Sequence, residues 1–542
     1  MTNKDIAGKI KLLADLMELH DENAFRIKSY ANAYLSIRKF PKNLTESSES
    51  EIADFPGLGK SVTQKIVELV QTGTMVDLDI LLHKTPEGVT DMLRVKGLGP
   101  KKVKALWKGE LSIEDTAELY QACMENRLIK LPGFGTKTQE DIKDKLQFHF
   151  SNQGKYHLAT VYEIAHELLN ILKINYKDYL FEISGEIRRK MPIVNGIDIL
   201  STMNSKEVAS EIFSPSDSEA HILYKDIPVT YKSVEPSQFY YTWATESSSP
   251  EFATAMGWEN RQYNSEDDVF KSVGSSYLTP EYRESEATAI GLKQGETFNL
   301  IEENDIRGLI HNHSTYSDGV HTLKEMADAA QKKGYQYLVI SDHSISAFYA
   351  NGLKIDDVYR QWEEIEQLNK QFHGFRILKG IEADILNDGR LDYGDDILSG
   401  FEIVIASIHS NLRMDLEKAT TRLIKAIENP FTHILGHPTG RLLLGRKGYD
   451  INYEKIFDAC AANNVAIELN CNPLRMDLDW TQIPKALEKG IKICINPDAH
   501  NIAQYDFVRF GIFTARKAGL TPAECLNNLS CQDLLEWADM KK

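Results

Sequence analysis

The sequence contains no run of 18 apolar residues, although 42% of its 542 residues are hydrophobic. A helix that crosses a membrane needs about 20 such residues, so we expect no membrane span. The first ten residues, MTNKDIAGKI, lack the basic-then-apolar layout of a signal peptide. These absences argue against a membrane or secreted protein and predict a cytoplasmic one without a membrane partner.

Cysteine is scarce, and the chain has no CxxC pair. Disulfide frameworks belong to small secreted domains that are rich in cysteine, so the scarcity of cysteine here argues against a disulfide framework. Several cysteines lie within apolar runs, and we expect buried, reduced thiols. The six are Cys123, Cys460, Cys471, Cys494, Cys525 and Cys531.

The chain also lacks an excess of positive charge, since its formal net charge is −17. This argues against a generic nucleic-acid coat. Residues 1–150 hold 22 basic and 22 acidic side chains, so the remainder carries the whole negative charge. A neutral domain can still hold DNA if its donors cluster on one face, whereas an acidic domain needs metal ions before a polyanion can approach it.

Three short segments resemble one another, each with a glycine, a hydrophobic residue and a glycine between two helical patterns. They read FPGLGKSVTQKI from Phe55, VKGLGPKKVKAL from Val95 and LPGFGTKTQEDI from Leu131. Glycine permits the tight turn, and the amides that begin the next helix form an anion site suited to a DNA phosphate. A simple glycine helix cap is the alternative. Three copies followed by lysines favour sequence-independent DNA binding through Gly57, Gly59, Lys60, Gly97, Gly99, Lys101, Lys102, Gly133, Gly135 and Lys137.

These helix-hairpin-helix segments, together with FRIKSYANAYLSIRKFP at residues 25–41, resemble the N-terminal region of bacterial family X DNA polymerases. The segment ISGEIRRKMPIVNGIDIL at residues 183–200 is similar to the palm signature of that family, G-S-x-R-R followed by D-x-D on a strand. Gly185, Arg188 and Arg189 match that signature, but Glu186 replaces the serine expected to bind the triphosphate.

The carboxylates of the palm signature are incomplete. Nucleotidyl transfer needs three of them to hold two magnesium ions. Asp198 matches the second, whereas Gly196 stands at the first position and Thr230 at the third. One carboxylate cannot fix two magnesium ions, so we expect a palm that has kept its fold and serves DNA binding without polymerising.

From Arg307 onward, short apolar strands alternate with amphipathic helices, which favours a parallel barrel of seven β-then-α units. In such barrels the chemistry lies at the carboxyl ends of the strands. His311 and His313 are two residues apart, so both face one way on an extended strand, and Asp498 and His500 repeat this arrangement. The predicted strands are GLIHNH, QYLVISD, RILKGIEADI, EIVIASIH, THILGH, VAIELN and IKICINPDAH.

The residues that end these strands resemble, position by position, the metal ligands of the PHP (polymerase and histidinol phosphatase) family. The matching residues are His311, His313, Asp318, His343, Glu382, His409, His437, Asp498 and His500. The resemblance implies three divalent ions, bridged in part by Glu382, and we assign the catalytic roles to Glu382, His343 and Asp498. Mixed histidine and carboxylate ligation suits Mn²⁺ or Zn²⁺ better than Mg²⁺, and relatives fused to family X polymerases point to Mn²⁺.

Several side chains near the strand ends are candidates for holding the substrate. Arg441, Arg446 and Arg475 could bind a flanking phosphate or could be solvated loop arginines. Tyr316 and Tyr393 could stack on a terminal base or pack in the core or at the rim.

The sequence therefore predicts a multidomain chain, which we expect to be monomeric. The expected parts are a lyase-like helical domain (1–80), a fingers-like hairpin region (81–150), a polymerase-beta-like α+β palm and thumb (151–290), a linker (291–306) and a (β/α)7 PHP barrel (307–542).

The favoured function is metal-dependent 3′→5′ exonuclease action in DNA repair, on 3′ ends of single strands or of gapped or damaged duplex. Three alternatives remain open at this point. They are an active gap-filling polymerase with exonuclease activity, a phosphomonoesterase that acts on a small molecule, and a non-catalytic scaffold that binds DNA ends.

Overall fold

The computed structural model describes residues 1–95, 97–124, 127–204, 207–208, 212–215 and 222–541. The chain divides into two compact units, Met1–Gln153 and Gly154–Lys542, which are described separately.

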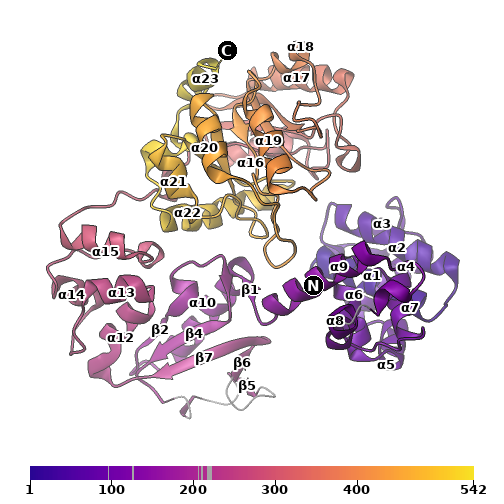
Figure 1. The fold of residues 1–542 in the computed structure, drawn as a ribbon, viewed down its shortest axis with the longest axis horizontal. Helices are drawn as coiled ribbons and strands as arrows, with labels where there is room; N and C mark the ends of the chain where they lie inside the picture. The colour runs from indigo at the N-terminus through magenta and orange to yellow at the C-terminus, as the bar shows by residue number, and fades with distance from the viewer. Residues whose placement is uncertain (96, 125–126, 205–206, 209–211, 216–221, 542) are drawn as a thin grey trace. The chain divides into compact units, whose positions relative to one another are not determined.

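The first unit is built from helices in its described part (Figure 1). On α1 (Asn3–Leu19), Ile6, Ile10, Leu13 and Met17 recur at three- and four-residue spacing and are buried, so the helix packs one apolar face into the core. The other α-helices are α2 (Ala24–Lys39), α3 (Glu49–Ala53), α4 (Lys60–Thr72), α5 (Val76–Lys84), α6 (Glu87–Arg94), α7 (Pro100–Trp107), α8 (Thr116–Met124) and α9 (Thr136–Asn152).

The second unit opens with a mixed sheet that α10 (Leu158–Asn175) covers. The strand order is β2-β4-β7-β6-β5. These strands are β2 (Phe181–Ile183), β4 (Ile197–Ser201), β7 (Ile227–Ser233), β6 (Ile222–Tyr224) and β5 (Ser214–Pro215). Two short strands, β1 (Tyr156–His157) and β3 (Ile193–Val194), pair beside it. The palm signature begins in β2, continues through α11 (Gly185–Arg188) and ends in β4.

A small helical layer with its own apolar core follows the sheet. It consists of α12 (Phe239–Glu246), α13 (Pro250–Met256), α14 (Glu266–Lys271) and α15 (Glu286–Lys293).

The C-terminal part of this unit is a nearly closed barrel of seven parallel strands, which confirms the predicted β-then-α units. The strands follow chain order, and a parallel bridge between Asn312 and Ala499 joins the first to the last. They are β8 (Gly308–Leu309), β9 (Tyr337–Ile340), β10 (Arg376–Asp384), β11 (Ile403–Ser407), β12 (Ile434–Leu435), β13 (Ala466–Asn470) and β14 (Ile493–Asn496).

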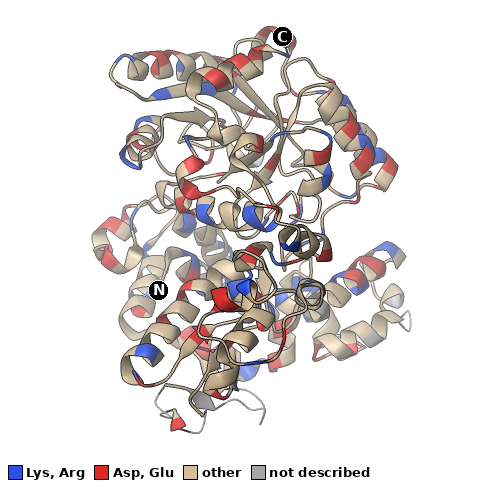
Figure 2. Cartoon of the chain, turned by 90° about the vertical axis from the view of Figure 1, so that its left-hand side faces the viewer, with Lys and Arg blue, Asp and Glu red and all other residues tan. Residues whose placement is uncertain are grey.

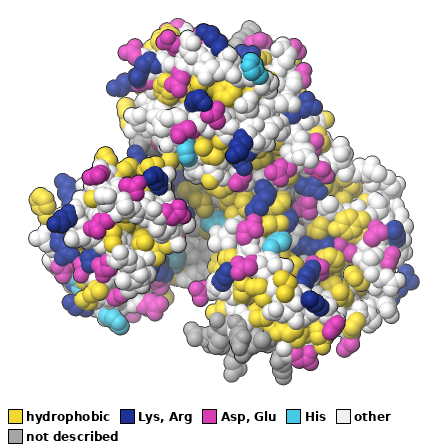
Figure 3. All heavy atoms as spheres, turned by 180° about the vertical axis from the view of Figure 1, so that it is seen from behind, with side chains coloured by type: hydrophobic (Ala, Val, Ile, Leu, Met, Phe, Trp, Pro, Cys, Tyr) yellow, Lys and Arg dark blue, Asp and Glu magenta, His cyan; other side chains and the backbone are white. Residues whose placement is uncertain are grey.

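Seven helices accompany the strands (Figure 1). Acidic and basic residues are mixed along their outer faces (Figure 2), and the surface in Figure 3 shows apolar side chains in small groups between polar ones. The helices are α16 (Leu323–Lys332), α17 (Ile355–Asn369), α18 (Asp395–Leu398), α19 (Leu416–Ile427), α20 (Tyr453–Ala462), α21 (Ile483–Glu488) and α22 (Val508–Lys517).

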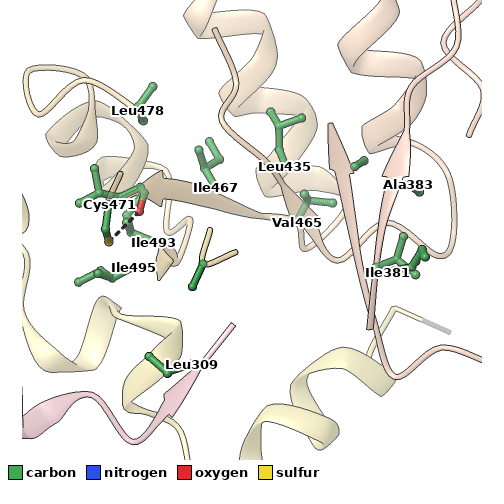
Figure 4. Close-up of a cluster of buried hydrophobic side chains, with 14 of the residues drawn as sticks. Leu309, Ile381, Ala383, Leu435, Val465, Ile467, Cys471, Leu478, Ile493 and Ile495 are labelled. Atoms are coloured by element: carbon green, nitrogen blue, oxygen red, sulfur yellow. Dashed lines mark hydrogen bonds between the residues drawn. The ribbon is translucent and has the colours of Figure 1, made fainter. Parts of the chain in front are cut away.

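Alternate residues of the barrel strands enter two different cores, because neighbouring side chains on a strand point to opposite faces. Leu338 and Ile340 belong to the larger core that also contains the residues labelled in Figure 4, whereas Tyr337 and Val339 belong to a second, smaller one. The last helix, α23 (Cys531–Asp539), contributes Trp537 to this second core. Lys541, just after α23, donates to the carbonyls of Ile427 and Thr432, which precede β12. The last helix therefore closes the amino end of the barrel, opposite the metal-ligand candidates.

The sheet and the barrel pack directly against each other within the second unit. Met476 and Phe510 of the barrel are buried in the core of the sheet, and His157 Nε2 donates to the carbonyl of Leu443 over 2.9 Å. The buried ammonium of Lys517 pairs with Glu284 and also donates to the carbonyl of Arg189. These contacts fix the barrel to the palm-like sheet.

All six cysteines are free, and all except Cys531 are buried. Among the described residues, none of the helices combines the length and the apolar character that a membrane crossing requires.

Candidate metal centre and DNA-binding hairpins

The carboxyl ends of the barrel strands bring the nine predicted ligands into one cluster. Three overlapping groups have ligand atoms within 4.8 Å of one another: His313, Asp318, His343 and His500; His311, His313 and Glu382; and His343, Glu382 and His409. His437 and Asp498 join these groups through Glu382 and His313, respectively.

Glu382, at the carboxyl end of β10, lies at the centre of the cluster. Its Oε1 is 3.2 Å from His311 Nε2, 3.1 Å from His409 Nε2 and 3.0 Å from His437 Nε2. Its Oε2 is 3.0 Å from His343 Nδ1. Because its two oxygens face histidines from four other strands, this carboxylate is placed to bridge more than one cation.

The more open side of the cluster contains Asp318 and His500. Asp318 Oδ1 is 3.4 Å from His500 Nε2 and 3.7 Å from His343 Nε2. Asp498 Oδ1 is 3.2 Å from His313 Nε2 and links this side to the interior. Asp318 and His500 are partly exposed, whereas His311 and His313 are fully buried, so solvent reaches the cluster from this side.

Two buried carboxylates outside the predicted set orient ligand histidines. His311 Nδ1 donates to Glu468 over 2.6 Å, and His409 Nδ1 donates to Asp384 over 2.5 Å. Each bond leaves Nε2 directed at Glu382 and fixes the ring. Neither residue was predicted from the sequence, although a glutamate inside the apolar strand VAIELN is a signal, because a buried charge requires partners.

The electrostatics of the metal-free cluster couple its carboxylates to its histidines. Burial alone would raise the pKa of Glu382, but the surrounding histidines, His409 first, hold it well below its usual range. Burial, together with the charges of His500 and His343, lowers the pKa of His313 to about 3. Burial would also lower the pKa of His409, but Glu382 and Asp384 raise it to about 10, so this imidazole must release a proton before it can ligate a metal.

The donor set fits divalent metal ions. Among the described residues, the buried His311 Nε2, His313 Nδ1 and Glu382 Oε2 have no hydrogen-bond partner, an arrangement that costs free energy unless a ligand satisfies it. His311, His437 and Asp498 also adopt positive φ values of 66°, 21° and 50°. Such backbone strain in residues other than glycine is concentrated at functional sites.

The three candidate arginines have different surroundings. Arg441 is committed within the barrel, because its guanidinium donates to the carbonyls of Arg475 and Met476 and pairs with Asp479. Arg475 Nε lies 3.7 Å from Asp498 Oδ2, at the metal-ligand cluster. Arg446 donates through Nε and Nη2 to the carbonyl of Gly440, and burial, followed by the charge of Arg475, lowers its pKa.

The two candidate stacking tyrosines also have internal partners. Tyr393 is buried and its hydroxyl donates to the carbonyl of Leu353, so core packing accounts for it. Tyr316 is half-buried and its hydroxyl donates to Glu364 over 2.7 Å.

The three hairpins of the first unit have one shared geometry. Gly57, Gly97 and Gly133 adopt φ values of +86°, +91° and +83°, which favour glycine. The hydrophobic residues that follow them are buried, and the second glycines N-cap α4, α7 and α9. Lys60, Lys101 and Lys137 are exposed in the first turn of these helices, and Lys102 is half-buried, so each helix begins with free space for an anion.

The palm-like sheet places the polymerase positions as the sequence resemblance implies, but with other side chains. Asp198 pairs in register with Thr230 on the neighbouring strand. A side chain at Gly196 would begin 2.5 Å from the carbonyl oxygen of Pro228. Glu186 accepts hydrogen bonds from Asn195, and burial followed by the charge of Glu186 raises the pKa of Asp198.

The retained arginines of the signature form internal ion pairs. Arg188 makes two bonds of 2.7 and 2.6 Å to Glu266 and lies over the ring of Trp243. Arg189 pairs with Glu284 at 2.9 Å. Both guanidiniums therefore hold the palm-like part together.

Comparison with known families agrees with this division of the chain. The family described as "Helix-hairpin-helix domain" matches residues 1–75, the "SAM-like Helix-hairpin-helix tandem" matches residues 89–147, and the "PHP domain" matches residues 310–472.

Individual relatives fall into two groups. A probable phosphatase from Thermoanaerobacter sp. (strain X514) is 32% identical over 40% of this chain and 88% of its own length. A probable phosphatase from Caldicellulosiruptor bescii is 30% identical over 35% of this chain and 78% of its own length. By contrast, the DNA polymerase/3′-5′ exonuclease PolX of Bacillus subtilis (strain 168) is 32% identical over 98% of this chain and 99% of its own length. The chain belongs to the PolX family, with helix-hairpin-helix domains at its N-terminus and a PHP domain at its C-terminus.

Proposed function

We propose that this protein is a metal-dependent 3′→5′ DNA exonuclease whose palm-like part does not polymerise. The observation that carries the proposal is the convergence of nine metal-ligand side chains around Glu382, next to a palm that has one of the three required carboxylates. The domain boundaries expected from the sequence and the monomeric state belong to the same proposal.

DNA is the proposed substrate because the hairpins suit its backbone. Three helix N-termini of the same geometry, each next to an exposed lysine, can contact phosphates without reading bases. The chain matches the Bacillus subtilis DNA polymerase/3′-5′ exonuclease PolX over 99% of that protein's length, whereas the probable phosphatase from Thermoanaerobacter sp. (strain X514) matches 40% of this chain. A phosphomonoesterase for small molecules would not use such hairpins.

The proposed ligands are the nine clustered residues, and three Mn²⁺ ions are the proposed occupants, with Zn²⁺ as the alternative. When bound, such ions lower the pKa of a water molecule and stabilise the charge on a leaving oxygen. Glu382 and Asp498 supply the negative charge that retains the cations, and the buried histidines fix the geometry. Asp318 and His500 border the more exposed side, where a phosphodiester would enter.

Arg446 and Arg475 are the proposed phosphate-binding residues. A guanidinium offers planar donors that match phosphate oxygens, and Arg475 lies next to Asp498. Arg441 would support phosphate binding only indirectly, because its guanidinium donates to the carbonyls of residues 475 and 476 and holds that segment in place.

The palm-like part is proposed to hold DNA and support the barrel. Besides lacking two carboxylates, it has little room for a restored aspartate, since any side chain at residue 196 meets the Pro228 carbonyl. Glu186 would repel a triphosphate at the position where the family binds one.

A ladder assay tests the exonuclease. A 5′-labelled oligonucleotide with Mn²⁺ should give progressively shorter products with the wild type, whereas His343→Ala or Glu382→Ala should give none. His373→Ala is the matched control, because His373 is an exposed barrel histidine outside the cluster. Equal ladders from the wild type and the ligand variants would mean that another nuclease is responsible.

Two further assays on the same preparation separate the alternatives. Extension of a primer–template with dNTPs and Mg²⁺ or Mn²⁺ would disprove the proposal that the palm-like part does not polymerise. Faster turnover of p-nitrophenyl phosphate than of DNA would favour the phosphomonoesterase. DNA binding without metal or hydrolysis would favour the scaffold.

A further inference from the structure

One aromatic side chain at the active-site end of the barrel is almost fully exposed. Phe348 lies on the loop between β9 and α17 and is 88% exposed. This loop leaves the barrel at the proposed ligand His343 and returns to it, since Leu353 N donates to the His343 carbonyl over 2.8 Å. Loops that follow barrel strands border the active site.

The loop itself is well held, so the exposure of Phe348 is not the result of a loose segment. Ala347 and Ala350, on either side of it, are buried. Asp392 accepts hydrogen bonds from Ser344 Oγ at 2.7 Å and from Ser346 N at 2.8 Å. Gly352 N also donates to Ala347 O over 3.0 Å. The backbone is therefore anchored on both sides of the exposed ring.

The far side of the loop approaches another ligand. Asn351 Nδ2 donates to the carbonyl of Tyr316 over 3.3 Å, and Tyr316 is two residues before Asp318. The loop therefore spans from His343 to the segment of Asp318, along the more exposed side of the metal-ligand cluster. Tyr316 and Tyr393 have internal partners, as described above, which leaves Phe348 as the aromatic ring presented to solvent in this loop among its described side chains.

We propose that Phe348 is a stacking platform for the terminal base of the DNA strand that enters the metal site. This inference rests on the proposed exonuclease function and adds a substrate-binding residue to it. An aromatic ring accepts any base, because every base has a flat face. The platform would therefore hold a frayed or single-stranded end regardless of sequence while the phosphodiester lies at the proposed metal ligands.

Kinetics of Phe348→Ala and Phe348→Trp test the platform. Loss of a stacked base costs about 5- to 100-fold in affinity. Phe348→Ala should therefore raise the KM for a single-stranded oligonucleotide by that factor. Phe348→Trp keeps an aromatic ring and should have a KM close to that of the wild type. Bound Mn²⁺ and the kcat for bis-p-nitrophenyl phosphate should stay unchanged, because Phe348 is outside the nine candidate metal ligands. Met540→Ala is the matched control, since Met540 is 70% exposed at the end of α23.

A base-free substrate decides whether the ring and the base touch. The wild type should have a higher KM for an oligonucleotide whose 3′-terminal residue lacks a base. The increase should equal the one that Phe348→Ala causes with the normal strand. The two losses should not add. Additive losses, or an unchanged KM in Phe348→Ala, would overturn the platform. A wild type that hydrolyses the small ester but no oligonucleotide would instead overturn the proposed function.

Discussion

At the scale of single residues, the proposed metal site depends on groups outside the nine candidate ligands. Glu468 accepts a hydrogen bond from His311 and also from the side-chain amides of Asn470 and Asn496, at 2.8 and 2.9 Å. It is fully buried, so this network must satisfy its charge. The ring orientation of His311 therefore depends on a residue that is not itself a candidate ligand.

Glu468→Gln should weaken metal binding while the fold survives. The amide keeps the shape of the carboxylate but loses the charge that makes the His311 imidazole a stronger metal ligand. Such changes typically cost about 10- to 100-fold in metal affinity. Titration of the metal-free protein with Mn²⁺ measures the effect. Glu428→Gln, at an exposed position on the barrel, should bind as the wild type does, and equal affinities for both variants would contradict the role of Glu468.

At the scale of elements, the β9–β10 pair carries both His343 and Glu382, and a glycine sets its spacing. A Cβ at Gly380 would lie 2.6 Å from the carbonyl oxygen of Ile340 and 2.5 Å from Val339 Cγ1. The two strands must therefore separate before any side chain fits there. Because both ligands follow this pairing, a shift of the strands also moves the metal site.

Gly380→Ala should lower both stability and metal affinity. Overpacking of a barrel core costs about 1–3 kcal/mol, which thermal unfolding would register as a lower Tm. Gly445→Ala is the control, because its Cβ would meet its nearest neighbour at 3.6 Å. Retention of the wild-type Tm and Mn²⁺ affinity in Gly380→Ala would show that the strands adapt without cost.

The hairpins of the first unit lead to a prediction about salt. Lys60, Lys101 and Lys137 are all exposed, Lys60 directly after its second glycine and the other two one position further on. If each contacts one phosphate, each change to alanine should reduce by about 1 the slope of log affinity against log salt concentration. Fluorescence anisotropy with labelled duplexes of two unrelated sequences measures this. A loss that depends on sequence would indicate base contacts instead.

Much of this element-level organisation could be predicted from the sequence, because every barrel strand except β13 is an apolar run that ends in or leads into a histidine or carboxylate candidate. The glycine pattern likewise predicted the hairpins, whose positive φ values only glycine adopts easily. The sequence could not show the left-handed backbone of His311, since that strain depends on the assembled barrel. It also could not show that Arg441 is internally bonded or that Phe348 is exposed, because both depend on loop conformation.

At the scale of the whole molecule, the ion pairs between sheet and barrel give the palm-like part a structural role within the second unit. Glu284 is the centre of this contact, since it pairs with Arg189 of the palm signature and with the buried Lys517 of α22. Arg189 of the palm signature is therefore used for internal packing in this chain. The palm-like part supports the barrel whether or not it polymerises.

Glu284→Gln should destabilise the second unit strongly. Removal of one partner from a buried ion pair leaves an uncompensated charge and costs about 3–5 kcal/mol. Glu163→Gln breaks the exposed pair with Arg509 and should cost about 1 kcal/mol or less. Urea unfolding of the two variants gives the comparison, and similar midpoints would contradict the importance of the buried contact.

The closing of the barrel by its last helix has a consequence for synthesis of the protein. The first ligand pair follows β8, the last pair follows β14, and Lys541, after α23, donates to the carbonyls of Ile427 and Thr432. A ribosome must therefore synthesise the chain through Lys541 before the nine candidate ligands can assemble in a closed barrel. A polypeptide cut before β14 would have its hairpins without the complete proposed metal site, so the proposed activity would begin only once the barrel has folded.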